Sequence, residues 1–281
     1  MVPAPRPVRR LLSRLSFWLR ALRAFRGLKL GSELNLWVSA LADTLFYTMA
    51  GSACNARLML SGLHFYRVRG LGLAVVRGGT DDLYNLLPGR EGDVEEFIRS
   101  RLAEGSVFVD VGANVGYYAL LASKLVGPSG RVHAVEPVPS TAVILRANVR
   151  LNSCGNVRVH EVAAWSARGR VMLNIPVSSY GLASATRGRS SGAVTVTARA
   201  APLDEVMSGE GAVDLVKIDV EGAELEVVRG ARSTLRKTQY VVLELSHRAR
   251  EVLKELREAG FECRKARFTS YILCRRSGLK A

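Results

Sequence analysis

Residues 106–118 read Ser-Val-Phe-Val-Asp-Val-Gly-Ala-Asn-Val-Gly-Tyr-Tyr, and this stretch decides the fold. Its first half, Val107 to Val111, is an apolar run rich in β-branched residues, which is typical of a strand buried on both faces. Gly112 and Gly116 frame a tight turn, and a helical pattern begins at Tyr117. A strand, a glycine turn and a helix start together bring the backbone close to a nucleotide-like ligand.

Two carboxylates flank this turn. Asp110 lies near the end of the first strand, and Glu136 follows the next apolar run, 20 residues after Gly116. An acid at the tip of the second strand can hold a ribose diol through charge-assisted hydrogen bonds. A dinucleotide needs a third glycine for its pyrophosphate, which Asp110 would also repel, whereas S-adenosylmethionine is cationic. We therefore predict an S-adenosylmethionine site, the alternative being a strand–helix turn without a ligand.

A second group of acids lies in the stretch Lys-Ile-Asp-Val-Glu-Gly-Ala-Glu at residues 217–224. Lys217, Asp219 and Glu221 alternate with apolar neighbours, so we expect them on one side of a strand over 215–220. Their charges would emerge at the carboxyl end of that strand, where open α/β sheets place their chemistry. The next predicted strand, 239–246, leads into Glu244 and His247 in the same way.

These motifs resemble the FkbM family of S-adenosylmethionine-dependent methyltransferases over about residues 75–275. The resemblance is carried, in order and spacing, by the strings at 107–116, 135–137, 217–224 and 243–247. Lys-Ile-Asp-Val-Glu-Gly is the most discriminating, and Arg-Gly-Gly-Thr-Asp-Asp at 77–82 is similar to a segment that precedes the family's core domain. The resemblance implies an O-methyltransferase acting on a hydroxyl of a sugar or glycoconjugate, although the acceptor does not transfer with the fold.

Strands alternate with helices from residue 106 to residue 259, which predicts a Rossmann-like, doubly wound parallel sheet. A closing hairpin at 261–274 makes the last strand antiparallel, and this is the class I methyltransferase architecture. A further hairpin, 169–175 with 194–199, flanks a Ser/Gly-rich loop that is either a lid or plain flexible surface. The family resemblance implies that this loop lies near the acceptor, so we interpret it as a lid. We expect residues 101–281 to form this α/β domain and residues 1–100 a basic, mainly helical N-terminal extension.

The site residues expected from these arguments and from the resemblance fall into two sets. Cofactor contacts are expected from Asp110, Gly112, Ala113, Asn114, Gly116, Tyr117, Glu136, Pro137 and Ala163. Catalytic roles are expected for Lys217, Asp219, Glu221, Glu244 and His247. His247 has the intrinsic pKa of a base, with helix capping as the alternative. Asp219, Glu221 and Glu244 could instead coordinate Mg²⁺, so metal dependence stays open.

The formal net charge of +15 is concentrated at the two ends of the chain. Residues 1–30 carry eight basic residues and no acid, and residues 261–281 carry six basic residues and one acid. Basic ends suggest an anionic partner, either lipid head groups or nucleic acid. An RNA methyltransferase is therefore the second hypothesis, although no RNA-binding module is visible. A non-catalytic S-adenosylmethionine-binding scaffold is the third, and the acids at the strand ends argue against it.

The N-terminal segment has its own pattern. Apolar residues recur at helical spacing between the arginines, at Val8, Leu11, Leu12, Leu15, Trp18, Leu19, Leu22 and Phe25. Such a basic amphipathic helix either binds a membrane surface or packs on the catalytic domain. Arg14 and Arg20 make it a poor secretory signal, and residues 35–50, short for a span and interrupted by Asp43, predict a buried helix. We expect a cytoplasmic protein whose membrane contact, if present, is peripheral.

The four cysteines, Cys54, Cys154, Cys263 and Cys274, lack metal-ligand spacing. Cys263 and Cys274 can face each other across the closing hairpin. Reduced, buried cysteines are the default expectation.

Overall fold

The structure, a computed structural model, describes residues 6–50, 62–176, 193–245 and 248–278. It divides into two compact units, Met1–Arg90 and Glu91–Ala281. The division falls after Arg90 because helix α4 (Gly92–Arg101) packs with the elements that follow it, whereas the sequence places the boundary near residue 100.

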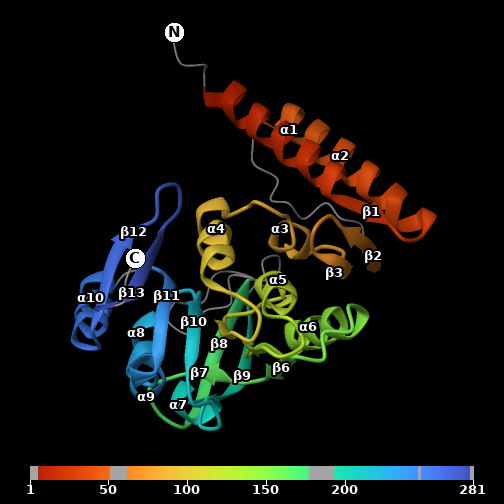
Figure 1. Cartoon of the computed structure of the whole chain (residues 1–281). Coiled ribbons are helices and arrows are strands. Elements are labelled where there is room, and N and C mark those ends of the chain that lie inside the picture. Colours follow the sequence, from red (N-terminus) through yellow and green to blue (C-terminus); the bar gives the residue numbers. More distant parts are fainter. Residues whose placement is uncertain (1–5, 51–61, 177–192, 246–247, 279–281) are drawn as a thin grey trace. The chain divides into compact units, whose positions relative to one another are not determined.

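The second unit is built on a seven-stranded sheet with the order β12-β13-β11-β10-β4-β5-β6 (Figure 1). Its strands are β4 (Val107–Val111), β5 (Arg131–Val135), β6 (Val157–His160), β10 (Val213–Ile218), β11 (Thr238–Glu244), β12 (Phe261–Lys265) and β13 (Tyr271–Arg276). The five strands from β11 to β6 are parallel, and β13 is antiparallel to both of its neighbours. This confirms the predicted doubly wound, Rossmann-like sheet with a terminal antiparallel hairpin. The strand order reverses between β4 and β10, which is where such sheets bind ligands.

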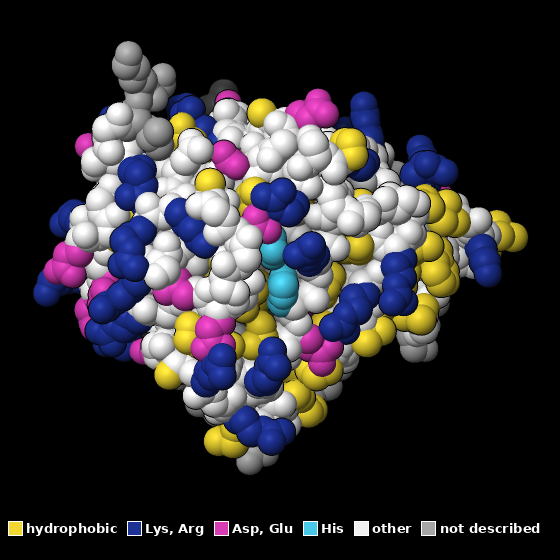
Figure 2. Space-filling view, turned by 60° about the horizontal axis from the view of Figure 1, so that its bottom comes forward, with side chains coloured by type: hydrophobic (Ala, Val, Ile, Leu, Met, Phe, Trp, Pro, Cys, Tyr) yellow, Lys and Arg dark blue, Asp and Glu magenta, His cyan; other side chains and the backbone are white. Residues whose placement is uncertain are grey.

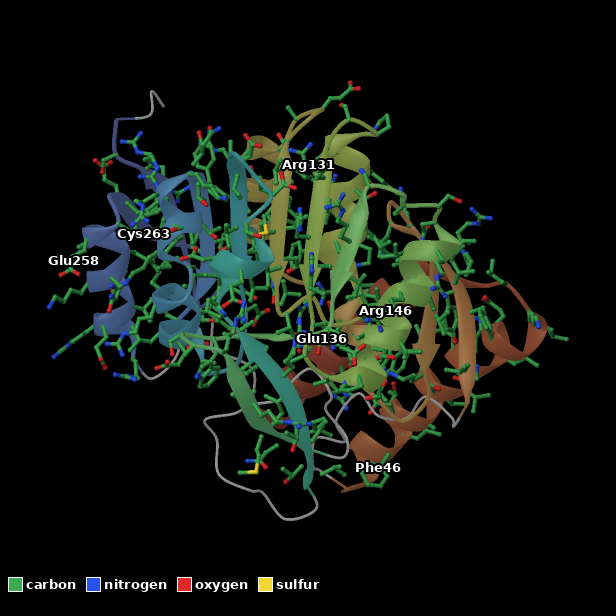
Figure 3. All side chains as sticks on the ribbon, turned by 90° about the horizontal axis from the view of Figure 1, so that it is seen from below. Phe46, Arg131, Glu136, Arg146, Glu258 and Cys263 are labelled. Atoms are coloured by element: carbon green, nitrogen blue, oxygen red, sulfur yellow. A yellow bond between two sulfur atoms is a disulfide. The ribbon has the colours of Figure 1, made fainter. Side chains whose placement is uncertain are left out.

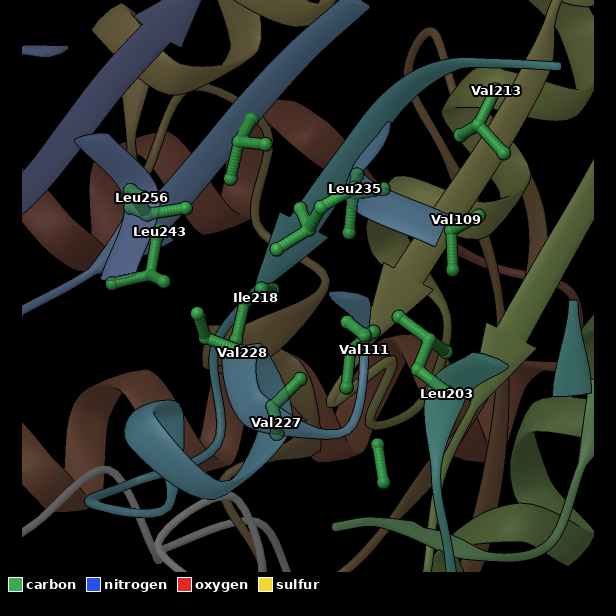
Figure 4. Packing of buried hydrophobic residues seen from close by; sticks show 14 of the residues in the cluster. Val109, Val111, Leu203, Val213, Ile218, Val227, Val228, Leu235, Leu243 and Leu256 are labelled. Atoms are coloured by element: carbon green, nitrogen blue, oxygen red, sulfur yellow. The ribbon is translucent and has the colours of Figure 1, made fainter. Parts of the chain in front are cut away.

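Helices cover this sheet because every residue of β4 is buried and must be shielded on both faces. The helices of this unit after α4 are α5 (Tyr117–Val126), α6 (Pro139–Leu151), α7 (Leu203–Val206), α8 (Glu224–Arg229), α9 (Arg232–Arg236) and α10 (Ala249–Glu258). On one side, Val109, Ile218 and Leu243 of the sheet belong to one buried cluster with Val228 of α8 and Leu256 of α10 (Figure 4). This packing holds the carboxyl ends of β4, β10 and β11 in a fixed relation.

The predicted single helix over 222–235 is wrong in one respect, since α8 and α9 are separate helices. The chain breaks at Gly230, where a Cβ atom would lie 1.8 Å from the carbonyl oxygen of Trp165. The close approach of the Trp165 backbone leaves room only for glycine at this position, where α8 ends. Strand β10 also ends at Ile218, two residues earlier than predicted.

A small sheet, with the order β7-β9-β8, follows β6 along the chain. It consists of β7 (Ala163–Ala164), β8 (Gly169–Pro176) and β9 (Ala193–Ala201). The antiparallel pairing of β8 with β9 is the predicted hairpin. The loop interpreted as a lid lies, from residue 177 to residue 192, outside the described residues.

The expectation of reduced cysteines is wrong for one pair. Cys263 and Cys274 are register partners in β12 and β13 and are joined by a disulfide. Directly opposed cysteines on neighbouring antiparallel strands lie close enough for this bond, so the hairpin itself explains the pairing. Cys154 is a free, buried thiol, and Cys54 lies outside the described residues.

The first unit contains a helical hairpin and a three-stranded antiparallel sheet with the order β1-β2-β3. Its elements are α1 (Arg6–Ala24), β1 (Phe25–Gly27), α2 (Leu30–Ala50), β2 (Leu63–Val68), β3 (Gly72–Arg77) and α3 (Asp82–Asn85). Asp82 is fully buried and accepts hydrogen bonds from Arg77 through both carboxylate oxygens, which closes the 77–82 turn. Within the part of the chain that the structure describes, no helix is long and apolar enough to cross a membrane.

The prediction of a buried helix over residues 35–50 needs correction. Helix α2 buries one side, but several of its large apolar side chains are exposed. The physical reason is the position of its polar residues, which face α1 and β2 rather than solvent.

Candidate active site

The glycine turn after β4 is shaped by close approaches that exclude side chains. Gly112 has a φ of 81°, and a Cβ atom there would lie 1.8 Å from the backbone oxygen of Asp219. Gly116 has a φ of 101°, and its Cβ would lie 2.6 Å from a methyl carbon of Leu145 on α6. Left-handed backbone of this kind favours glycine. The turn therefore lies against the end of β10 on one side and against α6 on the other.

Glu136 ties the end of β5 to this turn. Its Oε2 atom accepts a hydrogen bond of 2.9 Å from the backbone N–H of Asn114, and its Oε1 atom accepts one of 2.9 Å from the N–H of Val138. The carboxylate is buried, and Figure 3 labels it at the end of β5 opposite Arg131. The two hydrogen bonds hold the Glu136 carboxylate at the glycine turn, at the end of β5.

Asp110 is a buried carboxylate with an incomplete set of partners. It is the register partner of Lys217 on β10, whose Nζ atom lies 3.4 Å from Asp110 Oδ1. Neither carboxylate oxygen has a hydrogen-bond partner among the described residues. Burial raises the pKa of Asp110, and the neighbouring Lys217 only partly opposes this. A carboxylate in this situation suits a cationic ligand group.

Lys217 is fully buried and lies between two acids. Its Nζ atom is 3.3 Å from Asp219 Oδ2, and it also lies over the ring of Tyr118, 5.0 Å from the centroid. Burial lowers the pKa of Lys217, but the charges of Asp219, Asp110 and Glu91 outweigh it and the net shift is upward. Lys217 is therefore a permanent cation that joins the glycine turn to the next group of acids.

Asp219, Glu221 and Glu244 meet at the carboxyl ends of β10 and β11. One carboxylate oxygen from each lies within 4.8 Å of the others. Glu221 reaches the cluster from left-handed backbone, with a φ of 51°, and not from the predicted strand. Ser270 donates a hydrogen bond of 2.6 Å to Glu244 Oε1. Burial, together with the charges of Asp219 and Glu221, raises the pKa of Glu244 to about 7.

Tyr271 completes this cluster and is absent from the predicted site. It is the register partner of Glu244, and its hydroxyl donates a hydrogen bond of 2.7 Å to Asp219 Oδ2. Burial and the nearby Asp219 raise the pKa of Tyr271 well above its usual value, so its hydroxyl stays a donor. The antiparallel hairpin was predicted, but its register against β11 has no local sequence signal.

The remaining predicted residues are placed as follows. Ala113 is buried, and its N–H donates to the carbonyl of Val135. The hydroxyl of Tyr117 donates a hydrogen bond of 2.6 Å to Glu95 on α4. Pro137 follows Glu136 directly and is partly buried, Ala163 is buried at the start of β7, and His247 lies outside the described residues. The roles expected for these residues stay predictions.

The sheet order, the antiparallel β13 and the acids at the strand ends define a class I methyltransferase fold. A family model described as the methyltransferase FkbM domain matches residues 110–263, more than half of the chain. The chain belongs to the FkbM methyltransferase family, which confirms the resemblance read from its motifs.

Individual relatives are more distant. Methyltransferase sdnD of Sordaria araneosa is 30% identical over 162 residues, which cover 47% of this chain and 62% of the relative. Hexuronic acid methyltransferase AglP of Haloferax volcanii is 30% identical over 158 residues, 55% of this chain and 62% of the relative. The 2-O-methyltransferase NoeI of Sinorhizobium fredii is 28% identical over 158 residues, which cover 50% of this chain and 63% of the relative. The chain thus matches less than two thirds of the length of each.

Among solved structures, the methyltransferase FkbM of Methylobacillus flagellatus is similar, with 16% identity and a TM-score of 0.47. The similarity covers 95% of this chain and 60% of that one.

Proposed function

We propose that this protein transfers a methyl group from S-adenosylmethionine to a hydroxyl oxygen of a sugar or glycoconjugate. The proposal rests on one observation: two groups of acidic residues lie at the carboxyl ends of neighbouring strands. Asp110 and Glu136 flank the glycine turn, while Asp219, Glu221 and Glu244 form a cluster one strand away. The pair Asp110 and Glu136 suits a cofactor, and the cluster of three carboxylates suits the acceptor.

The residues at the turn fit S-adenosylmethionine, which supplies an electrophilic methyl group on a sulfonium. Asp110 would bind the ammonium of its amino acid part, because both carboxylate oxygens are buried without a hydrogen-bond partner in the described structure. Glu136 would accept hydrogen bonds from its ribose hydroxyls. A pyrophosphate would instead meet two buried carboxylates, so a dinucleotide fits poorly.

At the acceptor, Glu244 would remove the hydroxyl proton as the new O–C bond forms and the C–S bond breaks. A base with a pKa of about 7 combines ionisation at neutral pH with useful basicity. Asp219 would accept a hydrogen bond from a neighbouring acceptor hydroxyl, since Tyr271 and Lys217 hold its carboxylate in place. Correct positioning supplies a large part of the acceleration in such a displacement.

The sequence leaves open whether the protein depends on Mg²⁺, and the comparisons with known proteins give no support for such a dependence. The three carboxylates could still gather a cation, so a chelator belongs in every activity assay.

The names of two relatives support a sugar acceptor, since one is a hexuronic acid methyltransferase and another a 2-O-methyltransferase. The RNA alternative gains little from the second unit. Several basic side chains there are paired with acids, as in Arg131–Glu210, Arg146–Glu161 and Arg168–Glu205. On the face in Figure 2, Lys and Arg side chains are interspersed with Asp and Glu rather than gathered in one track.

A methyl-transfer assay with labelled S-adenosylmethionine tests the proposal, with cell-envelope glycans and total RNA offered side by side. We expect label in the glycan fraction, stable to mild alkali, because a methyl ether resists base whereas a methyl ester of a uronic acid does not. Label in RNA, or label released by alkali, would contradict the proposed acceptor. In parallel, Asp110→Asn and Glu136→Gln should each weaken S-adenosylmethionine binding by about 1–3 kcal/mol in calorimetric titration.

A further inference from the structure

In helix α2 of the first unit, most polar side chains are buried and the large apolar side chains that the structure describes, apart from Leu36, are exposed, which is the reverse of the pattern expected in water. Its buried polar side chains, none more than 5% exposed, are Ser32, Asn35, Ser39 and Asp43. Where the structure describes its side chains, from residue 30 to residue 46, every exposed position holds a glycine or a large apolar residue. The apolar ones, 47–75% exposed, are Leu30, Leu34, Trp37, Val38, Leu41, Leu45 and Phe46.

We call this set, from Leu30 to Phe46, the apolar stripe. Its members recur every three or four residues, so they lie along one side of the helix. A water-facing helix normally shows the reverse pattern, with polar residues outward. A contiguous exposed apolar surface of this kind marks an interaction site.

The inversion is held by specific bonds on the buried side. Asp43 accepts hydrogen bonds from Arg14 (2.8 Å) and from the indole N–H of Trp18 (2.7 Å), both on α1. Ser32 accepts a hydrogen bond of 3.1 Å from the backbone N–H of Phe65 on β2. Rotating α2 to expose its polar side would break these bonds. The apolar stripe therefore faces outward as a built feature of the first unit.

Helix α1, which runs beside α2 (Figure 1), also exposes apolar and basic side chains. Leu12, Leu15 and Leu19 are 38–56% exposed and lie one turn apart. Arg20 and Arg23 are exposed on the same helix. Residues 1–30 contain eight basic residues and no acid. The N-terminal part of the hairpin thus combines exposed leucines with a strong positive charge.

We propose that the α1–α2 hairpin docks on the surface of a bilayer containing anionic lipids. The apolar stripe would enter the boundary between head groups and acyl chains, and the arginines of α1 would contact lipid phosphates.

Three observations favour a bilayer over a protein partner. Polar groups turned inward and apolar groups outward are typical of helices surrounded by hydrocarbon. The excess of basic residues complements anionic head groups. Trp37, which is enriched as a residue type at membrane interfaces, lies in the stripe. No helix of the described chain can span a bilayer, so the hairpin would lie in the interface.

Vesicle co-sedimentation of the full-length protein tests this. The test variant is Leu34→Ser/Leu41→Ser, and the matched control is Val143→Ser/Leu151→Ser, which removes two exposed apolar residues from α6. We expect the wild type to bind vesicles of phosphatidylcholine with phosphatidylglycerol, more weakly at high salt, and to bind pure phosphatidylcholine less. The test variant should bind at least about tenfold more weakly, because two leucines no longer leave water. The control should bind like the wild type.

Trp37 offers a second measurement. Brominated acyl chains should quench the tryptophan fluorescence of the bound wild type, and Trp37→Phe should lose most of that quenching. S-adenosylmethionine binding should be the same in every variant, so failure of membrane docking is separable from failure of the proposed enzymatic function.

Four outcomes would overturn the proposal. The wild type could fail to bind anionic vesicles, or the test variant could bind them as tightly as the control. The wild type could be an oligomer that Leu34→Ser/Leu41→Ser converts to monomers in sedimentation velocity, which would make the stripe a self-interface. The test variant could also melt much earlier than the control, which would show that the protein itself covers the stripe.

Discussion

Lys217→Met should strongly destabilise the second unit, because it removes the cation between two acids and leaves the shape of the side chain nearly unchanged. The ammonium lies 3.4 Å from Asp110 and 3.3 Å from Asp219, and the side chains of Lys217 and Asp110 are 2% and 1% exposed. Removing one partner of a buried ion pair typically costs about 3–5 kcal/mol. That is a large share of the usual stability of a domain.

The loss should depend on pH in a predictable direction. Without Lys217, burial and the charge of Asp219 hold the pKa of Asp110 above its value in the unfolded chain. Between the unfolded and the folded pKa values, the folded protein then binds protons that the unfolded chain has released. Stability therefore falls as pH rises through that window, so the variant should be closer to wild type at about pH 5 than at about pH 8. Asp110→Asn in the same chain should restore part of the loss, with a coupling energy of about 0.5–3 kcal/mol.

Denaturant unfolding of the full chain at both pH values measures these effects. Lys254→Met is the matched control, since Lys254 is 77% exposed and its ion pair with Glu258 is on the surface. Such pairs contribute about 0–1 kcal/mol. The reasoning is refuted if the two lysine variants are equally stable, if the loss does not depend on pH, or if Asp110→Asn adds to it.

Two further predictions concern the carboxylate cluster. Because Glu244 must be ionised to accept a proton and its pKa is about 7, kcat should rise with pH through that value. Glu244→Gln should flatten this profile and lower kcat by about 10²–10⁴-fold, measured with labelled methyl donor and a chelator arm; an unchanged profile would place the base elsewhere. Tyr271→Phe should lower kcat by about tenfold, because it removes the hydrogen bond of 2.7 Å that the Tyr271 hydroxyl donates to Asp219. Calorimetric titration should show an unchanged affinity for the cofactor. A fall in cofactor affinity equal to the fall in kcat would argue against this positioning role.

The sheet and half of the site follow from local patterns in the sequence. Apolar runs separated by helical segments specify parallel strands, and the carboxyl ends of parallel strands meet at one edge. Asp110, Glu136, Asp219 and Glu244 each end or follow such a run, so their convergence is a consequence of topology. Nothing about their exact distances is needed for that prediction.

Other features depend on contacts between distant segments. Tyr271 meets Asp219 only through the register of β13 against β11. The need for glycine at position 230 arises from the backbone of Trp165, which is far away in the sequence. Helical periodicity shows that α2 has two sides, but it does not show which side is covered. That depends on whether its polar residues find partners, and Asp43 finds them on α1.

Three buried aspartates show why partners matter more than burial for recognising a site. Asp43, Asp82 and Asp110 are each at most 1% exposed. Both oxygens of Asp43 accept hydrogen bonds from α1, and both oxygens of Asp82 accept them from Arg77.

Asp110 differs, because among the described residues it has Lys217 nearby but no hydrogen bond to either oxygen. A buried carboxylate with a single ion-pair partner is costly, and a bound group that donates hydrogen bonds to it would lower that cost. An ammonium group both donates hydrogen bonds and carries the opposite charge, so the ammonium of the proposed cofactor would fit this position.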